Sequence, residues 1–164
     1  MNRTTGSVLT YRGVVYPWHC DHVGHMNVMW YAGKLDEATW NIFASWGMTA
    51  RYLNDLHRGM AAVQQNTTYK KELFAGDVVS VRTKILDVRE RVVRFQHEMI
   101  HDESSEVAAI SELTAVHIDL TTRKACAFPS EVLKRLRKML ASNPNRRDRS
   151  LPSSAGSRLH ILGQ

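Results

Sequence analysis

Residues 27–47 read NVMWYAGKLDEATWNIFASWG, and this stretch decides the fold. Apolar side chains recur in it at spacings of three and four residues, the pattern of one buried helical face: Val28, Tyr31, Leu35, Ala38, Ile42 and Trp46. Asn27 is a residue type that caps helix N-termini, and Gly47 is one that follows C-termini. Between them lie about 19 residues, or roughly 28 Å of helix. The sequence therefore predicts one long helix that needs a partner surface.

Segments on both sides of this helix read as strands. Val8 to Tyr16 is β-branched and aromatic, and Pro17 stops it. After the helix, apolar residues alternate with polar ones in four candidate strands: residues 60–73, 79–85, 93–99 and 107–120. The connections are short, which indicates antiparallel pairing, and Pro129 opens a last short helix over residues 130–140. The predicted class is α+β, with about five antiparallel strands against one long helix.

Composition limits the class of protein. A chain of 164 residues with 43% hydrophobic residues is expected to form a single domain, residues 1–141. Half of the net charge of +6 lies in residues 142–164, where four arginines face one aspartate among Pro, Ser, Asn and Gly. This segment is expected to be a disordered basic tail. No membrane span and no signal peptide are recognised, so the expected location is the cytoplasm.

Residues 18–27, WHCDHVGHMN, concentrate the reactive side chains. A zinc site would need three or four converging ligands, and the spacing of His19, His22 and His25 does not provide them. Cys20 beside a histidine suggests a thiol nucleophile, but adjacent residues of an extended segment point to opposite sides. We expect no metal and an inert thiol, and neither alternative is eliminated by sequence alone.

The third candidate in this stretch is the carboxylate of Asp21. It stands six residues before the expected N-cap, and Gly24 between them permits a tight bend. The first amides of a helix lack partners and stabilise negative charge, so they can polarise a carbonyl that the carboxylate attacks. Asp21 would then be a nucleophile or a general base. The alternative is that Asp21 only caps a turn.

The order of these elements and motifs resembles the hotdog fold, specifically the 4-hydroxybenzoyl-CoA thioesterase family. The resemblance covers residues 8–140. It rests on Asp21 to Asn27 (D-x-x-G-H-x-N), Tyr31 and the acidic pair Asp36-Glu37 on the helix, Tyr69 followed by Gly76-Asp77, Val116-His117-Ile118-Asp119, and Phe128-Pro129. Many members carry a second acidic residue two positions before the catalytic one, where this chain has His19.

The resemblance implies an acyl-CoA thioesterase that needs no cofactor and works as a homodimer or homotetramer. The residues expected to take part in catalysis are Asp21, His25, Asn27 and Val28, with the Val28 amide polarising the thioester carbonyl. Those expected to contact substrate are Gly24, Trp30, Tyr31, Lys70 and Arg91. Glu37 is the alternative catalytic carboxylate. The basic residues that could hold coenzyme A are Lys70, Lys71, Arg82, Arg89, Arg91 and Arg94.

Two other classes of function stay open at this stage. One is a non-catalytic acyl-CoA-binding or structural hotdog protein. The other is a nucleic-acid binder that uses the basic tail, which is disfavoured because the tail lacks interleaved aromatic residues; no nucleic-acid or membrane partner is expected. The acyl group is undecided, since the four tryptophans (Trp18, Trp30, Trp40 and Trp46) would suit an aromatic acyl group, a quaternary ammonium group or simply the core.

Overall fold

The computed structural model describes residues 6–143. Its elements, in chain order, are β1 (Val8–Val14), the 3-10 turn η1 (Pro17–His19), α1 (Val28–Ser45), α2 (Ala50–Leu56), β2 (Arg58–Tyr69), β3 (Val78–Val88), β4 (Val92–His101), β5 (Val107–Asp119) and α3 (Ser130–Ala141). The predicted long helix, the late strands and the C-terminal helix are thereby confirmed to within a few residues.

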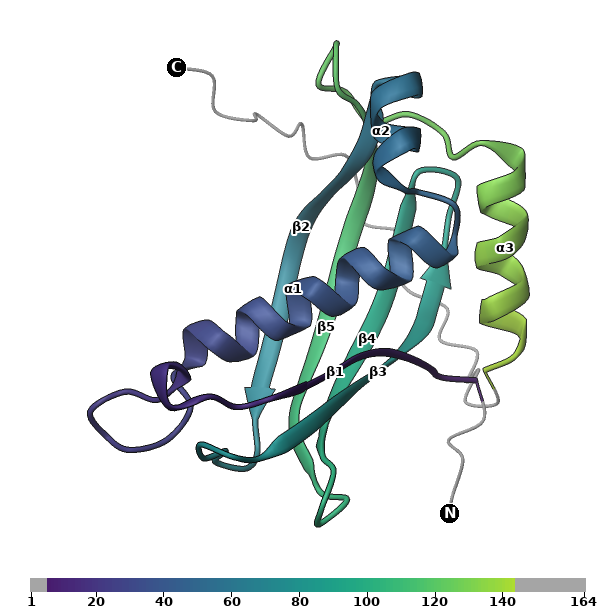
Figure 1. Ribbon diagram of the computed structural model, residues 1–164. Helices are drawn as coiled ribbons and strands as arrows, with labels where there is room; N and C mark the ends of the chain where they lie inside the picture. The colour runs from purple at the N-terminus through teal and green to yellow at the C-terminus, as the bar shows by residue number, and fades with distance from the viewer. Residues whose placement is uncertain (1–5, 144–164) are drawn as a thin grey trace.

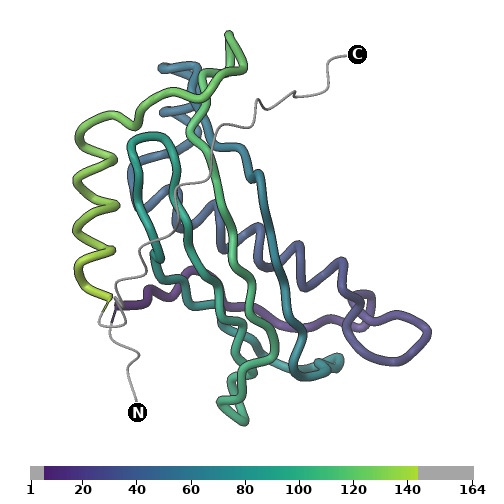
Figure 2. The backbone as a smooth tube through the Cα atoms, turned by 180° about the vertical axis from the view of Figure 1, so that it is seen from behind, coloured from purple at the N-terminus to yellow at the C-terminus, as the bar shows by residue number. Residues whose placement is uncertain are grey.

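The five strands form one antiparallel sheet in the order β1-β3-β4-β5-β2. The strands before and after the long helix are therefore the two edges of the sheet. Helix α1 crosses one face (Figure 1), and from behind the strands lie in front of it (Figure 2). The predicted α+β hotdog architecture, a sheet that wraps one central helix, is confirmed.

Helix α2 is the element that the sequence prediction missed. Thr49 caps it by accepting a hydrogen bond from the Tyr52 amide at 3.4 Å, and His57 ends it in the left-handed conformation at φ 48°. Seven residues are too few to show a helical period clearly. The helix brings the Tyr52 hydroxyl to 2.8 Å from Nε2 of His117 on β5.

Two apolar clusters divide the core along α1. One surrounds the first half of the helix and includes Met26, Tyr31, Leu35, Leu73, Val79, Val81 and Met99. The other surrounds the second half and includes Ile42, Phe43, Trp46, Ile85, Phe95, Phe128 and Leu136. Helix α3 closes the second cluster beside β3, so the first cluster is the one that underlies the N-terminus of α1.

A buried polar network lies on α1 and the sheet between these clusters. Thr39 on α1 donates to the Leu35 carbonyl at 3.0 Å, so its oxygen accepts from Nε2 of His97 at 2.9 Å. The other ring nitrogen of His97 then accepts from the Thr83 hydroxyl at 2.7 Å. Burial lowers the pKa of His97 to about 4. A neutral histidine therefore fixes the helix against β3 and β4 at neutral pH.

The described chain ends just past α3. The Asn143 side chain donates to the Ile85 carbonyl at 3.1 Å, two residues beyond the expected domain limit. The expected tail falls mainly on residues 144–164, which lie outside the described residues. Within residues 6–143, no helix has both the length and the apolar character needed to cross a membrane.

Candidate active site

The loop before α1 is a closed turn that is hydrogen-bonded to the segment between β2 and β3. The Asp21 amide donates to the His25 carbonyl at 3.1 Å, and the Gly24 amide donates to the Asp21 carbonyl at 3.0 Å. Gly24 has φ 95°, a left-handed conformation that favours glycine. The Met26 amide donates to the Leu73 carbonyl at 2.7 Å, which fixes the base of the turn. The backbone thus holds Asp21 in one orientation.

Two donors hold the Asp21 carboxylate. Oδ1 accepts from the Val23 amide at 2.9 Å, and Oδ2 accepts from the Asn27 side-chain amide at 2.8 Å. These bonds favour the charged form, and they hold the pKa of Asp21 below its usual value, the Val23 amide contributing most. The positive fields of His25 and His22 act in the same direction. Asp21 is accordingly an ionised, oriented carboxylate at neutral pH.

Asn27 links this carboxylate to the start of α1. Its side-chain oxygen accepts from the Met29 amide at 2.9 Å, and its carbonyl accepts from the Trp30 amide at 2.9 Å. The Val28 amide, between them, has no hydrogen-bond partner within residues 6–143. A free amide at a helix N-terminus is a donor for an anionic or polarised oxygen.

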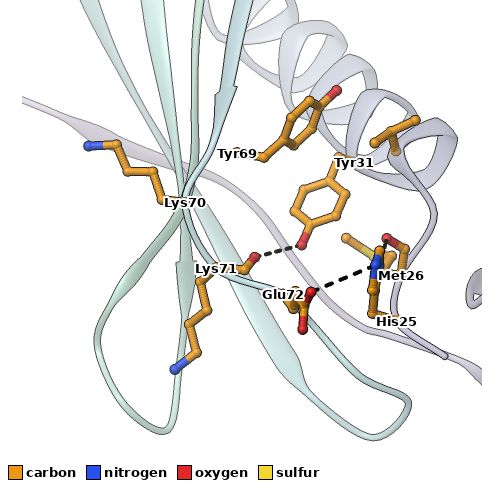
Figure 3. Close-up of a pocket in the computed structure, with 8 residues that line it drawn as sticks. His25, Met26, Tyr31, Tyr69, Lys70, Lys71 and Glu72 are labelled. Atoms are coloured by element: carbon orange, nitrogen blue, oxygen red, sulfur yellow. Dashed lines mark hydrogen bonds and ion pairs between the residues drawn. The ribbon is translucent and has the colours of Figure 1, made fainter. Parts of the chain in front are cut away.

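A cavity of about 320 Å³ opens beside this amide. Its lining comes from the loop, the start of α1 and the segment after β2: His25, Met26, Val28, Tyr31, Tyr69, Lys70, Lys71 and Glu72 (Figure 3). The Tyr31 hydroxyl donates to the Lys71 carbonyl at 2.8 Å, which ties α1 to that segment. Nε2 of His25 lies 3.8 Å from the Glu72 carboxylate, its neighbour in the lining.

The cavity brings together some of the predicted site residues. His25, Val28, Tyr31 and Lys70 line it. Asp21 and Asn27 are joined to its edge through their mutual hydrogen bond and the Asn27 cap of α1. Gly24 does not line the cavity; it shapes the turn that carries Asp21.

Two predicted substrate contacts lie elsewhere in the chain. Trp30 packs against His19 with ring centroids 4.1 Å apart and an interplanar angle of 34°, because it projects from a different side of α1 than Val28 and Tyr31. Arg91 lies in the turn between β3 and β4, where its carbonyl accepts from the His117 amide at 2.8 Å. That turn is at the opposite end of the sheet from Tyr69 (Figure 1), so Arg91 does not meet the cavity of its own chain.

The histidines of the stretch show no metal site. Within the described chain, no group of three His, Cys, Asp or Glu residues is arranged to hold a metal ion. His19 is buried, its Nδ1 accepts from the Tyr16 amide at 3.0 Å, and burial lowers its pKa. The ring of His19 packs against Trp30, with centroids 4.1 Å apart.

Within residues 6–143, the cysteine that contacts a histidine is Cys126 and not Cys20. Cys126 Sγ lies 3.3 Å from Nδ1 of His117, and Nδ1 also faces the Cys126 carbonyl at 3.1 Å. The Tyr52 hydroxyl lies 2.8 Å from Nε2, so the phenol donates there and Nδ1 carries the proton. Burial raises the pKa of the Cys126 thiol. A protonated thiol facing an N–H donor is not an activated nucleophile.

Sequence reasoning missed the cavity roles of Met26, Tyr69 and Glu72. The Tyr69 signal was present in the motif ending at Gly76-Asp77, but nothing in the alternation of β2 shows that its last residue faces a cavity. None of the four tryptophans lines the cavity, and Trp46 is fully buried in the core beside Phe43 and Phe95. The aromatic residues that line the cavity are Tyr31 and Tyr69.

Relatives of this chain are thioesterases by name. It is 24% identical over 147 residues to betainyl-CoA thioesterase of Pseudomonas aeruginosa, covering 90% of this chain and 89% of that protein. It is 26% identical over 142 residues to L-carnitine dehydrogenase/betainyl-CoA thioesterase of Agrobacterium fabrum, covering 87% of this chain. Our chain spans only 28% of that longer protein.

Solved structures share the fold. A Staphylococcus aureus protein solved in complex with CoA superposes with a TM-score of 0.79 at 21% identity, covering 99% of this chain and 98% of that one. A 1,4-dihydroxy-2-naphthoyl-CoA thioesterase from Synechocystis gives a TM-score of 0.69 at 18% identity, covering 82% and 96%. These likenesses support the hotdog fold.

The model of one protein family matches most of the described chain, residues 15–136. The match includes the Asp21 loop, α1, the whole of β2 to β5 and most of α3. It confirms the predicted thioesterase class at the level of this broad family, not the narrower 4-hydroxybenzoyl-CoA group expected from the sequence. The chain belongs to the thioesterase-like superfamily.

Proposed function

We propose that this protein is an acyl-CoA thioesterase that hydrolyses its substrate to a free acid and coenzyme A. The observation that carries the proposal is the pairing of an ionised Asp21 with a free helix N-terminal amide at Val28, linked through Asn27. Membership of the thioesterase-like superfamily supports the reaction class. The cavity beside Val28 supplies space for the reacting acyl group.

In this mechanism the Val28 amide donates to the thioester carbonyl oxygen, and the positive end of α1 adds to the polarisation. Negative charge grows on that oxygen as the carbonyl carbon is attacked. The C–S bond then breaks, and the leaving thiolate of coenzyme A takes up a proton. The loop keeps Asp21 oriented throughout, because Val23 and Asn27 occupy one lone pair on each carboxylate oxygen.

Asp21 has two chemically distinct options. As a nucleophile it forms a mixed anhydride with the acyl group, which water then hydrolyses. As a general base it removes a proton from the water that attacks the thioester. A single turnover in ¹⁸O-water separates them, since hydrolysis of the anhydride can leave label in Asp21 and direct attack by water cannot.

The other cavity residues position the substrate. His25 lies beside Glu72 in the cavity lining, and we assign it to orienting the loop and the acyl group. Lys70 is exposed beside the cavity and suits a coenzyme A phosphate. Arg91, remote within one chain, can serve coenzyme A only from a second subunit. Glu37 does not line the cavity, and we keep Asp21 as the catalytic carboxylate.

The proposed assembly is a homodimer or homotetramer. Strand β2 pairs with β5 alone among the described strands, and its outer edge runs through exposed residues 62–66. An open strand edge is a template for pairing with a second copy. Mass in solution tests this directly, and a monomer at assay concentration would contradict it.

A non-catalytic acyl-CoA-binding protein is the alternative function, and turnover decides between the two. We would measure free coenzyme A released from a panel of short, long, aromatic and quaternary-ammonium acyl-CoAs. The names of the two relatives make betainyl-CoA the first member to test. Cys20→Ser and His22→Ala are matched controls from the same loop, and each should retain most activity. Binding of the whole panel without release of coenzyme A would refute the enzymatic proposal.

A further inference from the structure

Two tyrosine rings form one wall of the cavity. Tyr31 and Tyr69 meet edge to face, with ring centroids 5.2 Å apart and an interplanar angle of 76°. The Tyr31 hydroxyl is committed to the Lys71 carbonyl, so it is not available to bind a polar acyl group. Tyr69 lines the cavity and is 48% exposed. Tyr31 is only 4% exposed, so most of the aromatic ring surface that this wall offers a ligand comes from Tyr69.

One carboxylate lies beside these rings. Glu72 lines the cavity, and its Oε1 atom is 3.8 Å from Nε2 of the His25 ring. Lys70 and Lys71 also belong to the lining, but their side chains point away from the two rings (Figure 3). Lys71 pairs with Glu106, which offsets its charge. Burial, with the nearby carboxylates of Glu72 and Asp77, raises the pKa of Tyr31 to about 12.

The rings also lie at the right place along α1. Tyr31 is three residues after Val28, and residues at this spacing share one face of a helix. An acyl group whose carbonyl accepts from the Val28 amide therefore places its next atoms beside Tyr31. A cation separated from the carbonyl by a single methylene group would lie against the tyrosine wall.

We infer that the cavity selects acyl groups that carry a quaternary ammonium close to the thioester, with Tyr69, Tyr31 and Glu72 as the selecting residues. The inference rests on the proposed thioesterase function and assigns the specificity of that same site. A methylated ammonium has no N–H donors, so it is recognised by aromatic faces and by a carboxylate rather than by hydrogen bonds. The wall provides these two groups and offers no free phenol donor from Tyr31.

A second aromatic cluster near the loop does not fit this role. Tyr16 and Trp18 stack face to face, with centroids 4.5 Å apart and an interplanar angle of 6°, so each covers a face of the other. Neither lines the cavity. Trp18, which is 66% exposed, therefore provides a matched aromatic control outside the site.

The test uses two thioesters of the same shape. Trimethylammonioacetyl-CoA carries the cation, and tert-butylacetyl-CoA replaces its nitrogen by carbon. The cation also makes the thioester carbonyl intrinsically more electrophilic, so charge recognition is measured as the change in the ratio of the two kcat/KM values between the parent and a variant. We expect the parent ratio to exceed that of Tyr69→Leu by about tenfold or more, the scale of a desolvated cation–π contact. Tyr69→Leu and Glu72→Gln should each lower this ratio, whereas Tyr69→Phe and Trp18→Leu should preserve it.

The outcomes separate this inference from the proposed function. A parent that hydrolyses both thioesters with equal kcat/KM overturns the inference and leaves the thioesterase function intact. An unchanged ratio in both Tyr69→Leu and Glu72→Gln also overturns it, even if overall activity falls, because a loss shared by both substrates is structural. Failure to hydrolyse any acyl-CoA would refute the proposed function itself.

Discussion

Replacing Asn27 separates two hydrogen bonds that one side chain makes. Its oxygen accepts from the Met29 amide and caps α1, while its nitrogen donates to Oδ2 of Asp21. Asn27→Ser keeps a capping oxygen but has no donor that reaches Asp21. Asn27→Ala removes both bonds. The pair of variants therefore distinguishes the stability of the helix from the chemistry of the carboxylate.

The expected stability effects follow from the cap. Asn27→Ala should destabilise the protein by about 1 kcal/mol, the usual loss for an N-cap. For a domain of this size that is a fall in Tm of about 3 °C. Asn27→Ser should unfold close to the parent temperature, because serine is an equally favourable cap.

The activity effects should follow the carboxylate instead. The Asn27 amide is one of the groups that lower the pKa of Asp21, after the Val23 amide. Without it the pKa rises towards the ordinary value. A nucleophile or a general base acts when deprotonated, so kcat/KM falls as pH drops through this pKa. The acid limb of the pH profile should therefore move to higher pH in both variants. Their kcat/KM should also be lower than that of the parent at each pH.

A profile of kcat/KM against pH and a thermal unfolding curve together test this reasoning. An acid limb that stays in place, or moves to lower pH, in Asn27→Ser would refute the role given to the Asn27–Asp21 bond. A large drop in the Tm of Asn27→Ser would show that the cap reading is wrong.

Three further predictions concern the core and metal dependence. The pKa of His97 is about 4 in the fold against about 6.5 in the unfolded chain, so the unfolded state binds more protons between these values. Urea unfolding should show that His97 contributes a fall in stability of about 3 kcal/mol from pH 7 to pH 4, so the slope of stability against pH should be shallower in His97→Gln by that amount; equal slopes would contradict it. Trp46→Ala empties a fully buried site and should cost about 3–5 kcal/mol by the same assay; a loss below about 1 kcal/mol would mean that the core collapses around it. Exhaustive chelation should leave turnover unchanged, as the ligand spacing around His22 and His25 predicts, whereas stoichiometric zinc with chelation-sensitive activity would disprove it.

The fold was predictable because its signals are periodic. The spacing of three and four residues from Val28 to Trp46 identified α1, and alternation identified β3 to β5. The Asn27 cap was predicted and is observed as a hydrogen bond to the Met29 amide. Helix α2 has no such period, since seven residues make only two turns.

The candidate site was predictable only for residues that are close together in the sequence. Asp21, His25, Asn27 and Val28 are neighbours in sequence, so the turn and the helix start bring them together. Tyr69 and Glu72 come from the end of β2, and only the sheet order and the Met26–Leu73 backbone bond bring that segment to the loop. Trp30 and Arg91 were expected to contact substrate because their residue types suit it, but helix rotation and sheet length place them away from this cavity within the chain.

The most direct test of the catalytic account is the single-turnover rate of Asp21→Asn on the best acyl-CoA of the panel. Asparagine keeps the size of the side chain and removes the charge that either role needs. Loss of a group acting in the transition state lowers the rate of the chemical step more than substrate binding. We predict a fall of about 10²-fold or more with comparatively unchanged thioester affinity. A variant that turns over like the parent, with Glu37→Gln inactive in the same assay, would contradict the assignment of Asp21.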